Sequence, residues 1–225
     1  MAIRILGSAD GSWQDEAAQA LLDIAASQRS QVDQRAWALY SLTFLDHHLR
    51  CGNSLVGATF QDLERYCYRV AGVVGEVAAA IFGGARSEDD RNIRRYAHEL
   101  GLAFQLTNII RDVGEDARRG RIYLPQDELA RFGVAEADIL NGRDTPEFQA
   151  LMQFQYERAN AHYDSALAAL PAHARRAQRP GLVMAAIYRT LLDEIRRDHF
   201  PVLRARVSLT PLRKLWLAGR TWLFP

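Results

Sequence analysis

The spacing of hydrophobic residues predicts helices along almost the whole chain. Leucine, isoleucine, tryptophan and tyrosine recur at the spacing of an amphipathic α-helix, and no segment alternates convincingly at the two-residue period of a strand. The predicted helices span about residues 14–28, 33–45, 60–82, 87–116, 145–170 and 180–198, and a short last helix begins near 211. We therefore predict an all-α protein.

Residues that favour helix ends mark several of these boundaries. Gly83–Gly84 is a natural C-terminal stop. Ser87 and the three acidic residues that follow it are typical of an N-cap with an acidic first turn. Thr145–Pro146 combines a capping hydroxyl with a proline at the first helical position. The main irregular stretch is predicted at 117–141.

Composition adds limits on the class of protein. The 225 residues are 48% hydrophobic, and 28 Lys and Arg against 27 Asp and Glu give a net charge of +1, so no general attraction to nucleic acid is expected. Two cysteines make no disulfide framework and suit a reducing compartment. The longest apolar run, 70–85, contains Glu76 and predicts a buried core helix rather than a membrane span. With no secretory signal visible, we expect a cytoplasmic protein.

One predicted helix face has oxygen-bearing side chains in line. At about 100° per residue, Gln105, Asn108, Asp112 and Asp116 fall within a stripe roughly 80° wide. Carboxylates at i and i+4 repel unless a cation lies between them, and oxygen ligands of this kind suit Mg²⁺. The alternative from geometry alone is a solvated helix face.

Arginines follow this stripe directly. Arg118, Arg119 and Arg121 surround Gly120, and arginine side chains match the geometry of phosphate oxygens. A solvated basic loop is the alternative for this segment taken alone. Next to the acidic stripe, however, the arginines predict a diphosphate held between Mg²⁺ and Arg118 and Arg121.

Two further segments leave alternatives open. Gly72 and Gly75, with the valines between 70 and 74, would make a smooth wall for a long hydrocarbon chain or for a neighbouring helix. Residues 212–224 mix leucine and tryptophan with Arg213, Lys214 and Arg220. Such a segment would either lie on a membrane surface or dock onto the protein's own core.

Four segments make the chain similar to a known family. They are YCYRVAG at 66–72, GLAFQLTNIIRDVGED at 101–116, GRIYLP at 120–125 and AIYRTLLDEI at 186–195. On these segments, residues from about 60 to 222 resemble the squalene/phytoene synthase family. Within the family they look most like the bacterial presqualene diphosphate synthases of hopanoid pathways.

The resemblance implies an isoprenoid-synthase-type helical bundle around a central apolar cavity. The implied reaction is the Mg²⁺-dependent head-to-head condensation of two farnesyl diphosphates to presqualene diphosphate, through a cyclopropyl intermediate and with release of diphosphate. The alternative within the family is a phytoene synthase that uses the longer geranylgeranyl diphosphate. Because such a product is strongly apolar, we expect the protein at the inner face of the membrane.

The resemblance also assigns roles by position. Asp112 and Asp116 match the second aspartate-rich motif, and Asn108 matches a further Mg²⁺ ligand. The remaining matches are Tyr66, Arg111, Tyr188 and Arg206 near the diphosphates, Gln105 lining the site, and Val70 and Val74 along the prenyl chain.

Residues 1–59 depart from this pattern. Family members have a first aspartate-rich motif on an N-terminal helix that faces the second, whereas no two acidic residues in 1–59 have the spacing D-x-x-x-D. We therefore expect an atypical N-terminal helical segment at 1–59 and a squalene/phytoene synthase-like domain at 60–225, with half of the metal site and some core helices missing. The rival hypothesis is a non-catalytic protein that binds prenyl diphosphate. A nucleic-acid role is not expected, because 1–59 has no basic stripe.

Overall fold

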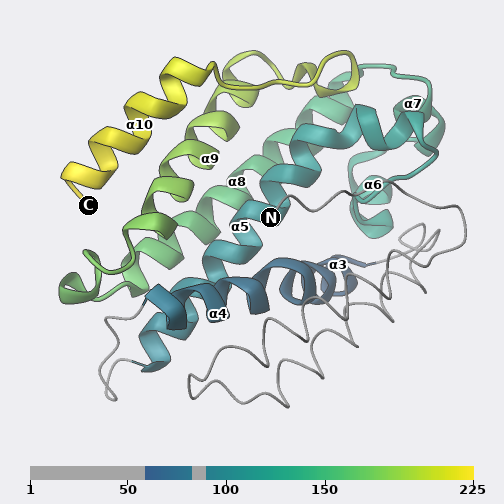
Figure 1. Ribbon diagram of the computed structural model, residues 1–225. Coiled ribbons are helices and arrows are strands. Elements are labelled where there is room, and N and C mark those ends of the chain that lie inside the picture. The colour runs from purple at the N-terminus through teal and green to yellow at the C-terminus, as the bar shows by residue number, and fades with distance from the viewer. Residues whose placement is uncertain (1–58, 83–89) are drawn as a thin grey trace, which may run out of the picture. The chain divides into compact units, whose positions relative to one another are not determined.

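The described part of the structure, a computed structural model, comprises residues 59–82 and 90–225 and is all-helical (Figure 1). Within these ranges there is no strand, as the hydrophobic spacing predicts. The elements are α3 Phe60–Cys67, η1 Tyr68–Gly72, α4 Val73–Phe82, α5 Asp90–Arg118, α6 Gln126–Phe132, α7 Glu136–Leu140, α8 Pro146–Ala169, η2 Ala172–Ala174, α9 Arg179–Arg197, η3 Pro201–Leu203 and α10 Pro211–Leu223.

The predicted helix at 60–82 is present, as α3, η1 and α4 in succession. It begins with a capping box, in which the Thr59 hydroxyl accepts a hydrogen bond from the backbone N–H of Asp62 while the Asp62 carboxylate accepts one from the Thr59 N–H. The middle element η1 is a π-helical turn, a feature that often occurs at functional sites. No helix in the described ranges is both long and apolar enough to cross a membrane.

Most of the other predicted boundaries are confirmed, with one correction. The Thr145 hydroxyl accepts from the Phe148 N–H at 3.2 Å and so caps α8, and the Thr210 hydroxyl caps α10 in the same way. The stretch predicted to be irregular at 117–141 contains α6 and α7. These helices are too short to show a periodic pattern. The helices predicted at 14–28 and 33–45 and the Gly83 and Ser87 signals lie outside the described residues.

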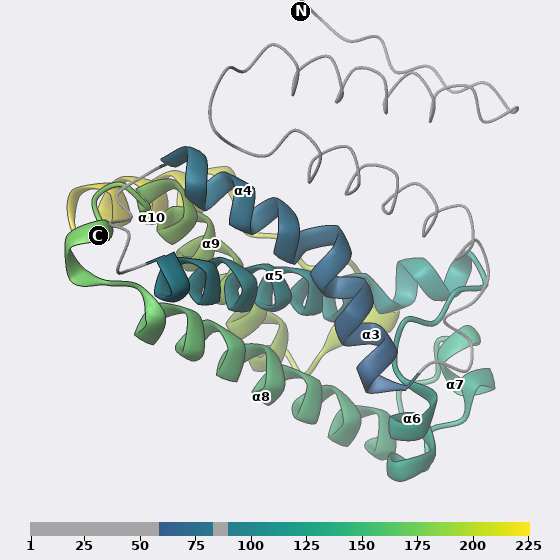
Figure 2. The ribbon, with the colours of Figure 1, turned by 90° about the horizontal axis from the view of Figure 1, so that it is seen from below.

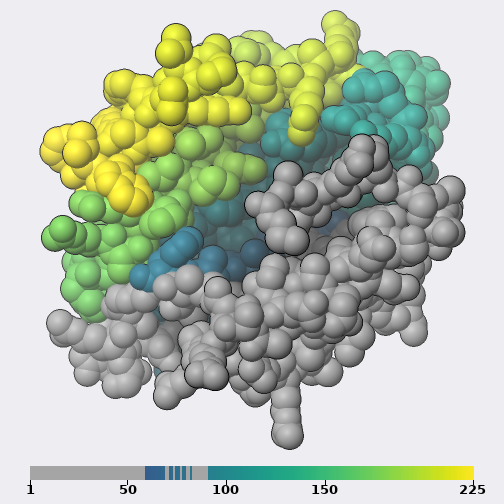
Figure 3. Space-filling model, viewed as in Figure 1, coloured from purple at the N-terminus to yellow at the C-terminus, as the bar shows by residue number. Residues whose placement is uncertain are grey.

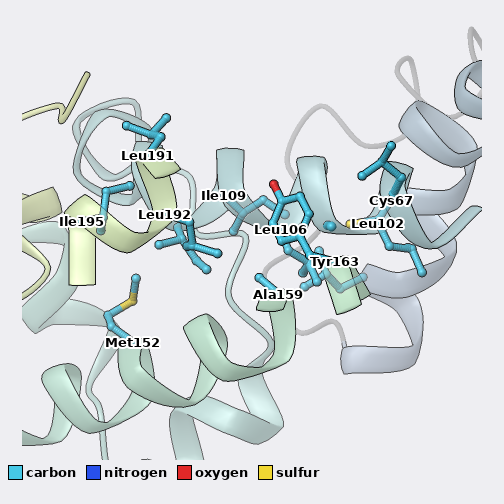
Figure 4. Close-up of a cluster of buried hydrophobic side chains, with 14 of the residues drawn as sticks. Cys67, Leu102, Leu106, Ile109, Met152, Ala159, Tyr163, Leu191, Leu192 and Ile195 are labelled. Carbon is cyan, nitrogen blue, oxygen red and sulfur yellow. The ribbon is translucent and has the colours of Figure 1, made fainter. Parts of the chain in front are cut away.

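Helix α5 is the centre of the described bundle. It packs along α8, against η1 and α4, and against α9 and η3, and Figure 2 shows it between α4 and α8. Its buried residues Leu102, Leu106 and Ile109 meet residues of α8 and α9 in the core (Figure 4). The helix with the polar stripe is therefore also the structural core of the bundle.

Two glycines of α5 allow neighbouring backbones to approach closely. A Cβ at Gly101 would lie 2.8 Å from the Ala71 carbonyl oxygen and equally close to the Gly72 backbone in η1. A Cβ at Gly114 would lie 2.7 Å from the Leu203 carbonyl oxygen in η3. Both contacts are with backbone atoms, which cannot rotate away as a side chain can. They fix where η1 and η3 sit against α5.

Candidate functional site

The polar stripe of α5 lies on one half-buried face of the helix. Asn108, Asp112 and Asp116 occupy successive turns, and the Asp112 side chain is 20% exposed. On the same helix, Gln105 is half-buried, and the buried residues Ile109 and Val113 tie the helix to the core. The predicted alignment of these oxygen-bearing residues is therefore present at the edge of the hydrophobic core.

Two arginines hold the carboxylate of Asp112. Arg111 donates from Nε to Oδ1 at 2.8 Å and from Nη2 to Oδ2 at 2.5 Å. Arg206, which follows η3, donates from Nε to Oδ1 at 2.9 Å and lies 3.6 Å from the Glu115 carboxylate. Partial burial raises the pKa of Asp112, but the hydrogen bonds from Arg111 and Arg206 outweigh this effect and leave the pKa below its ordinary value. Asp112 is therefore held as a carboxylate.

Asp116 lies in the opposite electrostatic environment. Partial burial and the nearby Asp112 carboxylate raise its pKa above the ordinary value, against the lowering effect of Arg119 and Arg121. The two carboxylates of the stripe thus repel each other, as their i,i+4 spacing predicts. A cation bound between them would relieve this repulsion.

Asn108 supplies an independent reason to consider a cation here. Its side-chain Oδ1 is buried and has no hydrogen-bond partner among the described residues. Most buried polar atoms do have one, so an orphaned acceptor needs an explanation. Together with two aspartates, an amide oxygen fits the hard oxygen ligands of Mg²⁺. Among the described residues, however, no cluster of three or more His, Cys, Asp or Glu could hold a metal, so further ligands would come from a bound diphosphate or from other residues.

Aromatic residues from three helices pack together near the arginine of the site. The hydrogen bond to Asp112 and, to a smaller extent, the nearby Tyr188 of α9 raise the pKa of the Arg111 guanidinium. The Tyr188 ring packs on Phe104 of α5 with centroids 5.0 Å apart, and Phe104 also contacts Tyr163 of α8 at 6.1 Å. The Tyr163 hydroxyl is 3.0 Å from that of Thr107. These contacts fix the position of Tyr188. Phe104, Thr107 and Tyr163 were not predicted, because only the packing of α5 against α8 and α9 brings them to the site.

The arginine loop folds back over the end of α5. The backbone N–H groups of Arg119 and Arg121 both donate to the Asp116 carbonyl oxygen at 2.9 Å, and the turn passes through Gly120 in a left-handed conformation with φ of 69°. Arg118 and Arg121 are exposed, while Arg119 pairs with Glu115 at 2.8 Å. The two arginines predicted to bind phosphate therefore lie beside the stripe with their side chains in solvent.

The loop continues to the aromatic pair that holds Tyr66. The Tyr66 ring stacks on Tyr123 with centroids 6.2 Å apart and an interplanar angle of 21°. Tyr66 is thus tied to the segment that follows the arginines.

An apolar groove of about 350 Å³ lies between α4, α5 and the start of α9. Small side chains line it, since Gly75, Ala78 and Gly101 leave the space open. Val74 is part of this lining, and the side chain of Val70 lies outside the described ones. Phe104 lines the groove and contacts Tyr188, which lies near Arg111. The groove and the polar stripe are therefore joined through two aromatic side chains.

A family model described as squalene/phytoene synthase matches residues 14–213. The match begins inside 1–59, so the expectation that this segment does not resemble the family is wrong from residue 14 onward. That expectation depended on one missing acidic motif, whereas the match extends over a longer pattern. The division of the chain at residue 59 stays a prediction.

Curated relatives are similar over part of their length. The 15-cis-phytoene synthase of Synechococcus elongatus is 42% identical over 166 residues, which make up 70% of this chain and 54% of the relative. The phytoene synthase of Arthrospira platensis is 43% identical over 166 residues, which again make up 70% of this chain and 54% of the relative. The chain thus spans about half the length of these relatives.

Solved structures support the same fold. A dehydrosqualene synthase in complex with ligand matches with a TM-score of 0.70 and 27% identity, over 96% of this chain and 78% of that one. The squalene synthase HpnC from Alicyclobacillus acidocaldarius matches with a TM-score of 0.64 and 22% identity, over 88% and 78% of the two chains. Such neighbours have an isoprenoid-synthase-type helical fold. With the match over residues 14–213, the chain belongs to the squalene/phytoene synthase family.

Proposed function

We propose that this chain is a Mg²⁺-dependent prenyltransferase that joins two farnesyl diphosphates head to head to presqualene diphosphate. The observation that supports this most directly is the arrangement along α5. Asn108, Asp112 and Asp116 lie on one face of this helix, and Phe104 of the same helix lines the apolar groove. A prenyl diphosphate has these two parts, a charged head and an apolar chain.

The charged end of the site would bind and draw away the diphosphate. Asp112, Asp116 and Asn108 would be the ligands of Mg²⁺, which when bound supplies positive charge to the oxygens of the leaving group. The Nε atoms of Arg111 and Arg206 lie 2.8 and 2.9 Å from Oδ1 of Asp112. Both guanidinium groups would release this carboxylate and bind diphosphate oxygens in its place. The exposed Arg118 and Arg121 would add further donors.

The apolar end would protect the carbocation. When the allylic C–O bond breaks, its electron pair leaves with the diphosphate. The resulting cation is attacked by the double bond of the second substrate, and loss of a proton closes the cyclopropane ring. The groove lining near Phe104 and Gly101 would hold the prenyl chain and exclude water, which would otherwise capture the cation.

A phytoene synthase reaction on geranylgeranyl diphosphate is the second candidate. It is favoured by the curated relatives, because the proteins that are 42% and 43% identical are named phytoene synthases. The two reactions share the same chemistry at the diphosphate and differ in chain length. The first experiment therefore offers both substrates.

The rival is a binding protein without turnover. The absence of the D-x-x-x-D spacing in residues 1–59 supports this rival, because half of the metal site would then be missing. Ionising the substrate calls for positive charge on both sides of the diphosphate. The two hypotheses predict the same binding and differ in product formation.

The test is incubation of the purified chain with farnesyl or geranylgeranyl diphosphate, with and without Mg²⁺, followed by analysis of diphosphate and of the phosphatase-treated organic product. Presqualene alcohol that forms only with Mg²⁺ supports the proposal, and a C40 product from the longer substrate supports the second candidate. Substrate binding without product in a folded sample supports the rival.

Asp112→Asn tests the assignment of the site. It should abolish Mg²⁺-dependent binding of diphosphate, measured by calorimetry. Asp138→Asn is the matched control, because Asp138 also accepts from an arginine Nε at 2.9 Å and its side chain is 24% exposed, against 20% for Asp112. Equal binding by the two variants would contradict the assignment.

A further inference from the structure

Helix α10 turns most of its apolar side chains away from the protein. Leu217 is buried and docks the helix, which packs on α9. Leu212, Leu215 and Trp216 are 80%, 69% and 60% exposed, and Leu223 is 68% exposed. These four lie on one face of the helix at 100° per residue, roughly opposite Leu217. The yellow atoms of α10 are in plain view in Figure 3.

Positive charge lies on the same helix. Arg220 borders the exposed face and lies over the Trp216 ring at 5.4 Å, and Lys214 is exposed on another side of the helix. Arg213 forms an ion pair with Glu194 of α9, which helps to fix the helix in this orientation. In sequence, residues 199–225 contain five Lys and Arg and no Asp or Glu. Helix α10 thus combines an apolar strip with the exposed cations Lys214 and Arg220.

We propose that the outer face of α10 binds the surface of an anionic lipid bilayer. Apolar side chains, tryptophan and flanking cations are the features that place a helix in the interfacial region of a membrane. The charges argue against a second copy of the chain as the occupant. A symmetric pair would bring the cations of the two α10 helices together with no carboxylate of residues 199–225 between them.

The position of α10 links this surface to the apolar groove. Trp222 near its end lies 5.5 Å from the Arg179 guanidinium, and Arg179 is flanked by the groove residues Gln178 and Pro180. The groove also has partly exposed apolar residues, with Met184 at 43% and Val74 at 49%. Binding of α10 to lipid would bring the α9 end of the groove toward the bilayer, where prenyl chains partition. This last step depends on the proposed function, whereas the lipid binding does not.

Vesicle sedimentation with the full chain tests the proposal without any substrate. We expect the protein to pellet with phosphatidylcholine vesicles that contain about 30% phosphatidylglycerol and to stay in solution with phosphatidylcholine alone. Raising NaCl from about 0.1 M to about 0.5 M should weaken the binding, because the charges are screened. A chain that stays in solution with both kinds of vesicle would overturn the proposal, whatever its enzymatic activity.

Substitutions in α10 test whether its outer face is the surface that binds lipid. Leu215→Ser with Trp216→Ser should weaken partitioning about tenfold, since both side chains would lose their apolar contact with lipid. Both are exposed, so the melting temperature should not change. Leu140→Ser is the control, because Leu140 is 46% exposed on α7, outside this surface. Unchanged partitioning of the double variant would overturn the proposal. So would light scattering that shows a dimer which the double variant abolishes, since the face would then bind a second copy.

Discussion

Gly114→Ala should destabilise the protein and loosen its candidate site. Gly114 lies on α5 between Asp112 and Asp116, where the helix crosses η3. A Cβ at this position would lie 2.7 Å from the Leu203 carbonyl oxygen, 2.8 Å from the Leu203 Cα and closer still to the Val202 carbonyl oxygen. Because all three are backbone atoms, either η3 or α5 has to move.

Two opposing effects set the magnitude. Alanine in place of glycine within a helix gains about 1 kcal/mol in the free energy of unfolding. Forcing a methyl group into a packed contact loses about 1–3 kcal/mol, and this crowded backbone contact belongs at or above the upper end of that range. The expected net loss is about 2 kcal/mol, or about 4–8 °C in melting temperature for a chain of this size. Movement of η3 would also shift Arg206 away from Asp112.

Thermal unfolding followed by circular dichroism measures the loss, and Gly219→Ala is the control. Gly219 also lies within a helix, α10, but a Cβ there meets no atom within 4 Å. The same substitution should therefore raise the melting temperature by about 2 °C through helix propensity alone. The sign of the effect thus depends only on the space around the glycine.

A Gly114→Ala protein as stable as the wild type would refute this reasoning. It would mean that η3 can move aside at no cost and that Gly114 does not determine the position of Arg206. Loss of stability in both Gly114→Ala and Gly219→Ala would also contradict it. A Cβ at Gly219 meets no atom within 4 Å, so the loss could not then be assigned to crowding.

Two further outcomes are expected. Glu128→Ala should lower the free energy of unfolding, measured in urea, by about 3 kcal/mol. The Glu128 side chain is only 7% exposed, and its loss leaves the Arg158 guanidinium, which is 15% exposed, without its carboxylate partner. A loss below about 1 kcal/mol would contradict this, because it would match an ion pair on the surface. Asp116→Asn should raise the melting temperature at neutral pH in metal-free buffer, because burial and the Asp112 carboxylate raise the pKa of Asp116 and so make its ionised form unfavourable in the folded state. Because the pKa of Asp116 is raised in the folded state, its ionisation destabilises the wild type as the pH rises. The advantage of the variant over the wild type should therefore vanish near about pH 3, where the Asp116 carboxyl is protonated in the folded and the unfolded state. Equal melting curves of the two proteins at neutral pH would contradict this.

The sequence by itself determined the helices and the order of polar residues on α5. Helical periodicity, the Thr145 cap and the spacing of Asn108, Asp112 and Asp116 are local properties, because the repeat of one helix decides which side chains share a face. The segments α6 and α7 were not predicted, since five to seven residues are too few for a periodic signal.

Only the tertiary structure decided what surrounds this face. Arg206 is 94 residues from Asp112 in sequence, and its ion pair exists because η3 packs against Gly114. The contact of Phe104 with Tyr188 likewise depends on how α9 crosses α5.

The sequence left the docking of α10 open between the protein core and a membrane surface. The structure shows that Leu217 docks the helix and that Leu212 and Trp216 face solvent. The physical reason is the same in each case. The sequence sets the pattern of a helix, but the packing between helices decides which parts of that pattern become core, site or surface.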